Sequence, residues 1–148
     1  MKILFLGDVV GISGCRKIIN DLSIQIQKNN IDFVIINGEN ADDTGVGLTK
    51  EICKNFFDNG VDVITTGNHV WDQKDIMNFI DKENRLLRPK NLFEPAPGRG
   101  FEIYESKKNC KVGVLNLMGN VFMKKCEDVF KISKEFLDKY NLKKEKKF

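Results

Sequence analysis

Residues 61–69 read VDVITTGNH, a short apolar run that ends in a glycine followed by polar side chains. A run of this length, rich in β-branched residues, is typical of a buried strand. The same arrangement occurs twice earlier in the chain, as KILFLGD at 2–8 and DFVIINGEN at 32–40. We therefore predict three buried strands, each of which ends in a glycine and a polar cluster.

Amphipathic segments separate these strands. Apolar residues recur at three- and four-residue spacing over about 15–28, which predicts a helix after a glycine-punctuated loop. A second helix is expected over 48–60, with Gly60 as its stop signal, and a third over about 72–80. Strands that alternate with helices of this length indicate βαβ units and a parallel sheet.

The second half of the chain has a different pattern. Residues 88–100 hold all three prolines and are expected to form a loop, whereas 100–106 and 110–117 are expected to pair as an antiparallel hairpin. A last helix is predicted over about 128–140. The prediction is an α/β domain over residues 1–140, with a mostly parallel sheet and a late antiparallel hairpin, followed by a basic tail at 141–148.

Composition narrows the class of protein. The chain has 148 residues, of which 41% are hydrophobic and 30% are charged, as in ordinary soluble proteins. The last ten residues hold five Lys and one Glu, so the rest of the chain sums to −1 although the net charge is +3. A uniformly basic surface for nucleic acid is therefore not expected.

The apolar runs and the cysteines indicate where in the cell the protein is expected. No apolar run approaches the roughly 20 residues of a membrane span. The apolar run near the N-terminus covers only residues 3–6, too short for the core of a signal peptide, and we expect a cytoplasmic protein. The four cysteines have no metal-binding spacing and are expected to be reduced and mostly buried; they are Cys15, Cys53, Cys110 and Cys126.

The polar clusters after the strands are the candidate site. The carboxyl ends of parallel strands meet at one edge of a sheet, and glycine lets the backbone turn sharply there. We therefore expect one cluster to form from Asp8, Glu39, Asn40, Asn68 and His69.

These residue types suit a metal-dependent reaction. Carboxylates and carboxamides supply hard oxygen ligands for magnesium, manganese or ferrous iron, and Glu39 could bridge two ions. His69, the only histidine in the chain, could donate a proton to a leaving oxygen, with Asp72 orienting its ring. Taken singly, each residue has an ordinary structural explanation as a cap, a turn residue or a structural histidine. Their shared position after three strands favours a site.

The motifs also carry a resemblance. ILFLGDVVG at 3–11, IINGENA at 35–41 and TTGNHVWD at 65–72 resemble the N-terminal motifs of calcineurin-like metallophosphoesterases, and more narrowly those of the bacterial YmdB-like family. Segments 88–91 and 97–100 resemble further segments of that family. The resemblance implies the N-terminal portion of a metallophosphoesterase α/β sandwich.

The resemblance also implies an activity. It implies hydrolysis of phosphodiesters, including cyclic nucleotides, at a site with two divalent metal ions (iron, manganese or magnesium). By their matching positions, Asp8, Glu39, Asn40 and Asn68 are expected to be metal ligands and His69 the general acid.

The resemblance leaves part of the family's site unmatched. Family members continue with three more metal-binding histidines and a second sheet, so we expect a truncated form with weak or no activity alone. We expect such a chain to form homo-oligomers, or to combine with a separately encoded C-terminal half.

Two hypotheses of other classes stay open. Gly7, Gly11 and Gly14 loosely match a dinucleotide-binding loop, with Glu39 as a possible ribose acceptor, although Asp8 would oppose a pyrophosphate. The chain could also be a non-catalytic interaction module that retains a weak metal or nucleotide site.

Overall fold

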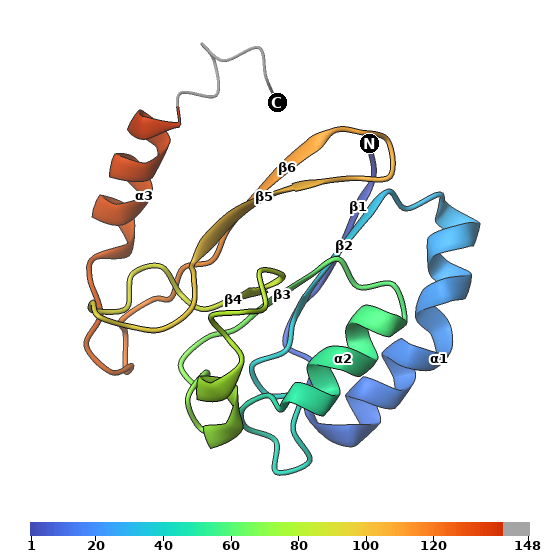
Figure 1. Cartoon of the computed structure of the whole chain (residues 1–148), viewed down its shortest axis with the longest axis horizontal. Coiled ribbons are helices and arrows are strands. Elements are labelled where there is room, and N and C mark those ends of the chain that lie inside the picture. The colour runs from blue at the N-terminus through green and yellow to red at the C-terminus, as the bar shows by residue number, and fades with distance from the viewer. Residues whose placement is uncertain (141–148) are drawn as a thin grey trace.

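A parallel sheet forms the centre of the molecule. The computed structural model describes residues 1–140, so the predicted basic tail lies outside the described residues. The sheet has the order β1 (Ile3–Leu6), β2 (Phe33–Asn37), β3 (Val63–Thr65) and β4 (Leu86–Leu87), all parallel (Figure 1). The three strands predicted from sequence are confirmed.

Two helices cover one face of this sheet (Figure 1). They are α1 (Gly11–Asn29) and α2 (Lys50–Asp58), and both bury apolar side chains against the sheet. Leu22 of α1 and Phe56 of α2 are buried in one core with Val34, Ile36 and Ile64 of the strands. Burial of this apolar area is the main term that holds the helices on the sheet.

The helix boundaries depend on backbone contacts as well as on periodicity. Helix α1 begins at Gly11, before the predicted start at residue 15. The N–H of Gly11 has no acceptor within the helix, and it donates instead to the carbonyl of Asn40 (2.9 Å). Helix α2 ends as predicted: Gly60 has a φ of 96°, and its N–H donates to the carbonyl of Phe57 (3.2 Å).

The segment after β3 departs from the prediction. In place of an α-helix over 72–80, the chain forms a shorter 3₁₀ helix, η1 (Lys74–Asn78). The sequence pattern does not predict β4, since two residues are too few to show periodicity. This strand exists because Leu86 and Leu87 pair with Ile64 and Thr65 of β3.

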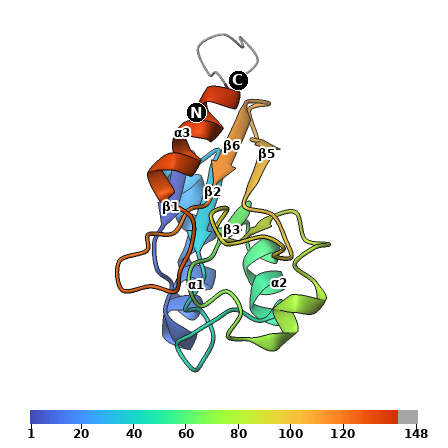
Figure 2. The same ribbon diagram turned by 90° about the vertical axis from the view of Figure 1, so that its left-hand side faces the viewer.

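The predicted hairpin covers the other face of the sheet. It consists of β5 (Phe101–Glu105) and β6 (Lys111–Leu115), paired antiparallel. Its Val112 and Val114 pack on Phe33, Ile35 and Val63 in a second core. The sheet therefore lies between the helices and the hairpin, as Figures 1 and 2 show.

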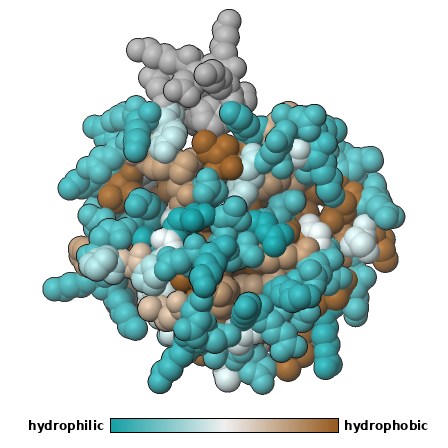
Figure 3. Space-filling view, in the orientation of Figure 1, coloured by the Kyte–Doolittle hydropathy of each residue, from teal (hydrophilic) through white to brown (hydrophobic). Residues whose placement is uncertain are grey.

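The last helix, α3 (Val129–Lys139), lies beside β5. The ring centroids of Phe136 and Phe101 are 4.4 Å apart. At the free edge of the sheet, Ile3 and Phe5 of β1 lie on the same side as the hairpin and stay 45% and 59% exposed. Hydrophobic surface also shows between polar side chains in the space-filling view (Figure 3).

The expectation that the cysteines are reduced and mostly buried agrees with the structure. All four cysteines are free, and only Cys110 is exposed. Within residues 1–140, no helix has the length and hydrophobicity that crossing a membrane requires.

Candidate functional site

The polar residues that follow β1, β2 and β3 lie at one edge of the sheet. The three strands are parallel neighbours, so their carboxyl ends are adjacent. Asp8 follows β1, Glu39 and Asn40 follow β2, and Asn68 and His69 follow β3. The sheet topology thus brings together residues that are far apart in the sequence.

Asp8 and Asn40 are in direct contact. The Nδ2 of Asn40 donates to Oδ1 of Asp8 at 2.7 Å. Asp8 has a φ of 45°, a left-handed conformation that is uncommon for a residue with a side chain. The Oδ1 of Asn40 is buried and has no hydrogen-bond partner among the described residues. This pair therefore keeps one oxygen acceptor available.

Glu39 lies against the backbone of Gly67. A Cβ at Gly67 would fall 2.5 Å from the carboxylate carbon of Glu39 and closer still to Oε2, so only glycine leaves room for this carboxylate. Its Oε2 is buried, and no group in the described part of the chain hydrogen-bonds to it. A buried oxygen without a partner is costly, so this oxygen is a candidate ligand position.

The burial of Glu39 shifts the pKa of its carboxyl. Desolvation raises the pKa of its carboxyl above the usual value, and the nearby negative charge of Asp8 adds to the shift. The backbone N–H groups of His69 and Asn68 lie near the carboxyl and, together with the His69 side chain, act in the opposite direction, although neither N–H forms a hydrogen bond with Oε2. A raised pKa of this origin is common where a carboxylate is held ready for a ligand.

His69 has a fixed ring orientation. Its Nδ1 lies 2.6 Å from Oδ2 of Asp72, the contact expected from the sequence. Both side chains are about one-third exposed, so the ring remains accessible from solvent. With Nδ1 engaged by Asp72, Nε2 is the ring nitrogen left to exchange a proton with a ligand.

A cavity of about 690 Å³ opens beside this edge. Glu39 and Asn68 both line it, together with the apolar faces of β1 and β6. Asp8, Asn40 and His69 do not line it. The structure thus gives Glu39 and Asn68 a common cavity, which the other three residues do not line.

The donor set fits a hard metal ion only when the amides are included. No three His, Cys, Asp or Glu side chains of residues 1–140 lie close enough together to hold an ion. The two partnerless oxygens, one from Glu39 and one from Asn40, are nevertheless the kind of donor that magnesium, manganese and ferrous iron prefer. On this observation, the residues present fit a metal.

Two residues of this region gain a role only from the structure. The sequence predicts Gly67 as a turn residue, whereas the structure shows that its missing side chain makes room for Glu39. The buried Asn116 donates to the carbonyls of Thr66 (2.8 Å) and Leu87 (3.0 Å), which ties the hairpin to the end of β3. The only hint of Asn116 in the sequence is a single amide inside an apolar run.

A sequence profile described as YmdB-like protein matches residues 4–148. The 2',3'-cyclic-nucleotide 2'-phosphodiesterase of Bacillus subtilis (strain 168) is 42% identical over 131 residues, which cover 88% of this chain and 48% of that protein. The chain thus spans about half the length of this relative.

Two solved structures have the same fold. A hypothetical protein from Thermus thermophilus superposes with a TM-score of 0.85 at 33% identity, over 93% of this chain and 53% of that one. A structure described as a novel phosphatase from Mycoplasma pneumoniae gives a TM-score of 0.85 at 35% identity, over 94% and 51%.

Proposed function

This chain belongs to the YmdB-like family, and we propose that its polar sheet edge is the metal-binding part of a phosphodiesterase site. The observation that carries the proposal is the Glu39 carboxylate, whose Oε2 is buried without a partner in the described chain, against Gly67. A protein keeps such a costly group where a ligand compensates for it. The names of the relatives supply the reaction class, a phosphodiesterase in one case and a phosphatase in the other.

Four residues would hold the metal ions. Asp8, Glu39, Asn40 and Asn68 are the oxygen donors at this edge, and Glu39 is best placed to serve two ions because it lies between the ends of β1 and β3. Divalent magnesium, manganese or iron would supply positive charge that polarises a phosphoryl oxygen and favours ionisation of water. Because the amide oxygens of Asn40 and Asn68 are neutral, they would leave most of the positive charge of the ions free to act on the phosphoryl group.

His69 is the proposed general acid. Asp72 holds Nδ1 at 2.6 Å and so fixes the direction in which Nε2 points. When the ester bond breaks, the leaving oxygen needs a proton, and Nε2–H can deliver it. Asp72 acts through His69 and is therefore a positioning residue.

Cyclic nucleotides are the proposed substrate class. The Bacillus subtilis relative is named for 2',3'-cyclic nucleotides, in which the leaving group is a ribose oxygen. Such an oxygen is a poor leaving group unless it is protonated, which suits an acid at the position of His69.

The isolated chain should bind metal weakly and turn over slowly. Its four oxygen donors fall short of the roughly six ligands that these hard ions prefer. The sequence contains a single histidine, so no copy of this chain can add an imidazole other than His69. A homo-oligomer would bury the exposed Ile3 and Phe5, and a separately encoded C-terminal half could do the same while adding ligands.

The deciding experiment is calorimetry with manganese on the isolated chain. We expect loose binding that Glu39→Ala abolishes and that Glu51→Ala, at an exposed position of α2, leaves unchanged. A chromogenic phosphodiester with manganese then measures turnover, which should increase when the part of a relative not covered by this chain is added. Tight binding that does not depend on Glu39 would place the metal elsewhere and refute the proposal.

The runner-up hypothesis, a dinucleotide site, has less support. Asp8 lies just before the N-terminal end of α1, where a pyrophosphate would bind, and its negative charge opposes one. Thermal stabilisation by manganese and not by NAD supports the metal site, and the reverse result supports the dinucleotide site.

A further inference from the structure

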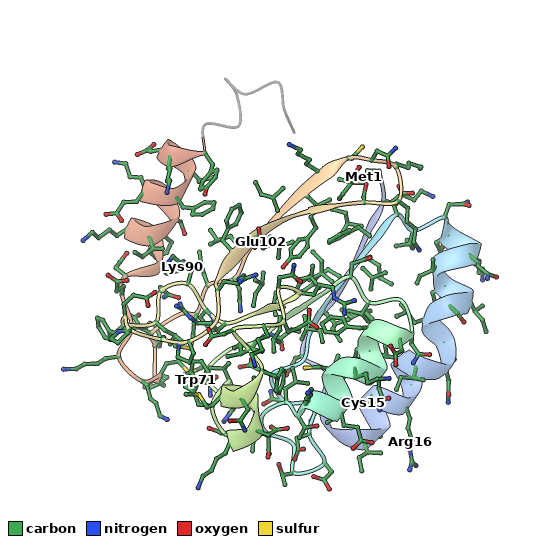
Figure 4. The ribbon with its side chains drawn as sticks, viewed as in Figure 1. Met1, Cys15, Arg16, Trp71, Lys90 and Glu102 are labelled. Atoms are coloured by element: carbon green, nitrogen blue, oxygen red, sulfur yellow. The ribbon has the colours of Figure 1, made fainter. Side chains whose placement is uncertain are left out.

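A second cavity adjoins the proposed site on its other side. It has a volume of about 410 Å³ and shares Asn68 with the cavity described above. Trp71, Met77 and Phe93 line it, so it lies between η1 and the loop that follows β4. Figure 4 places Trp71 beside η1.

Large apolar side chains in the lining of this cavity are exposed to solvent. Phe93 is 58% exposed and Met77 is 50% exposed. Trp71, in contrast, packs partly against the core, which fixes its indole. An open apolar pocket with one fixed aromatic wall is typical of a small-molecule site.

The charge of the cavity is positive. Lys124 and Lys125 line it, and no Asp or Glu of the described residues does. Neither lysine forms an ion pair with any residue of 1–140. A ligand that is flat, apolar and attached to an anion would match both the aromatic wall and the lysines.

We propose that this cavity binds the base of a nucleotide, with the phosphate on the side of Asn68 and the two lysines. This inference rests on the proposed function and names the part of the substrate that this pocket selects. The base stacks on Trp71 and Phe93, because aromatic side chains stack on any base. The shared Asn68 joins the pocket to the proposed metal-binding edge of the sheet, so the phosphate of a bound nucleotide would lie on the side of that edge.

Trp71 provides a direct measurement, because it is the only tryptophan in the chain. Its fluorescence should be quenched saturably by adenosine monophosphate in the absence of metal. Ribose phosphate, which lacks a base, should quench far less. Equal quenching by the two compounds, or none by either, would refute the base site.

Two variants of matched size test the stacking. Phe93→Ala should weaken nucleotide binding roughly tenfold, the scale of losing one aromatic–base contact. Phe130→Ala removes a phenyl group that is 82% exposed on α3, away from the cavity, and should leave binding unchanged. Both rings are exposed, so neither variant should unfold the protein. Equal effects of the two variants would show that Phe93 does not contact the base.

The lysines and the metal ligand separate this inference from the proposed function. Lys124→Ala with Lys125→Ala should weaken adenosine monophosphate and reduce the salt dependence of its binding, whereas adenosine should be little affected. Glu39→Ala should abolish the manganese response and leave the quenching intact. If quenching persists while turnover and manganese binding are absent, the result supports the base-binding pocket and refutes the phosphodiesterase proposal. If neither adenosine monophosphate nor adenosine binds and the surface instead associates with protein, the base site is refuted and the pocket is a docking site.

Discussion

Replacing Gly67 by alanine should disable the metal site while leaving the fold in place. The backbone at Gly67 is not in the left-handed region, so alanine causes no backbone strain there. The new methyl group would fall 2.5 Å from the carboxylate carbon of Glu39 and 2.8 Å from its Oε1. The carboxylate must therefore move, and with it the proposed bridging ligand.

The size of the effect follows from this overlap. Overpacking of a buried position costs about 1–3 kcal/mol, and a displaced ligand should weaken metal binding by about tenfold or more. Urea denaturation measures the first quantity and manganese calorimetry the second. Gly119→Ala is the matched control, because a Cβ there meets no atom within 4 Å. Adding Glu39→Asp to Gly67→Ala shortens the carboxylate and should recover part of the lost stability.

One result would refute this reasoning. If Gly67→Ala unfolds at the same urea concentration as Gly119→Ala, and manganese binding is unchanged, then the carboxylate of Glu39 does not lie against Gly67. The missing partner of Oε2 would then no longer argue for a ligand.

Three further outcomes are expected. Glu39→Gln should raise the free energy of unfolding of the metal-free protein at pH 7 by about 1–3 kcal/mol, since it removes the cost of a buried charge. Because burial raises the folded-state pKa of Glu39 above the unfolded value, this gain should shrink as the pH falls toward about 4, and a pH series of urea denaturations checks it. Asp72→Asn should lower turnover on the order of tenfold or more, measured as kcat against pH, because His69 loses its orienting carboxylate. Phe5→Glu should shift any self-association toward monomer in light scattering, since it places a charge on the exposed face beside Ile3.

Much of the fold could be predicted from local patterns. The strands at 3–6, 33–37 and 63–65 are short apolar runs that end at a glycine or a polar residue, and both features lie within a few residues. The contact between His69 and Asp72 spans three residues and requires only a turn. The hairpin could also be predicted from the sequence, because two apolar runs joined by a short polar link readily pair with each other.

The sequence by itself determined which residues stand at the ends of the strands, since parallel strands must end at the same edge. Only the tertiary structure decided the burial, the contacts and the hydrogen-bond partners of those residues. The partnerless oxygen of Glu39 depends on how closely Gly67, at the end of another strand, approaches it, and β4 exists only because β3 offers it hydrogen bonds. The cavity beside Asn68 is assembled from segments near residues 71, 93 and 124. These features arise from contacts between segments distant in the chain, and local periodicity contains no information about such contacts.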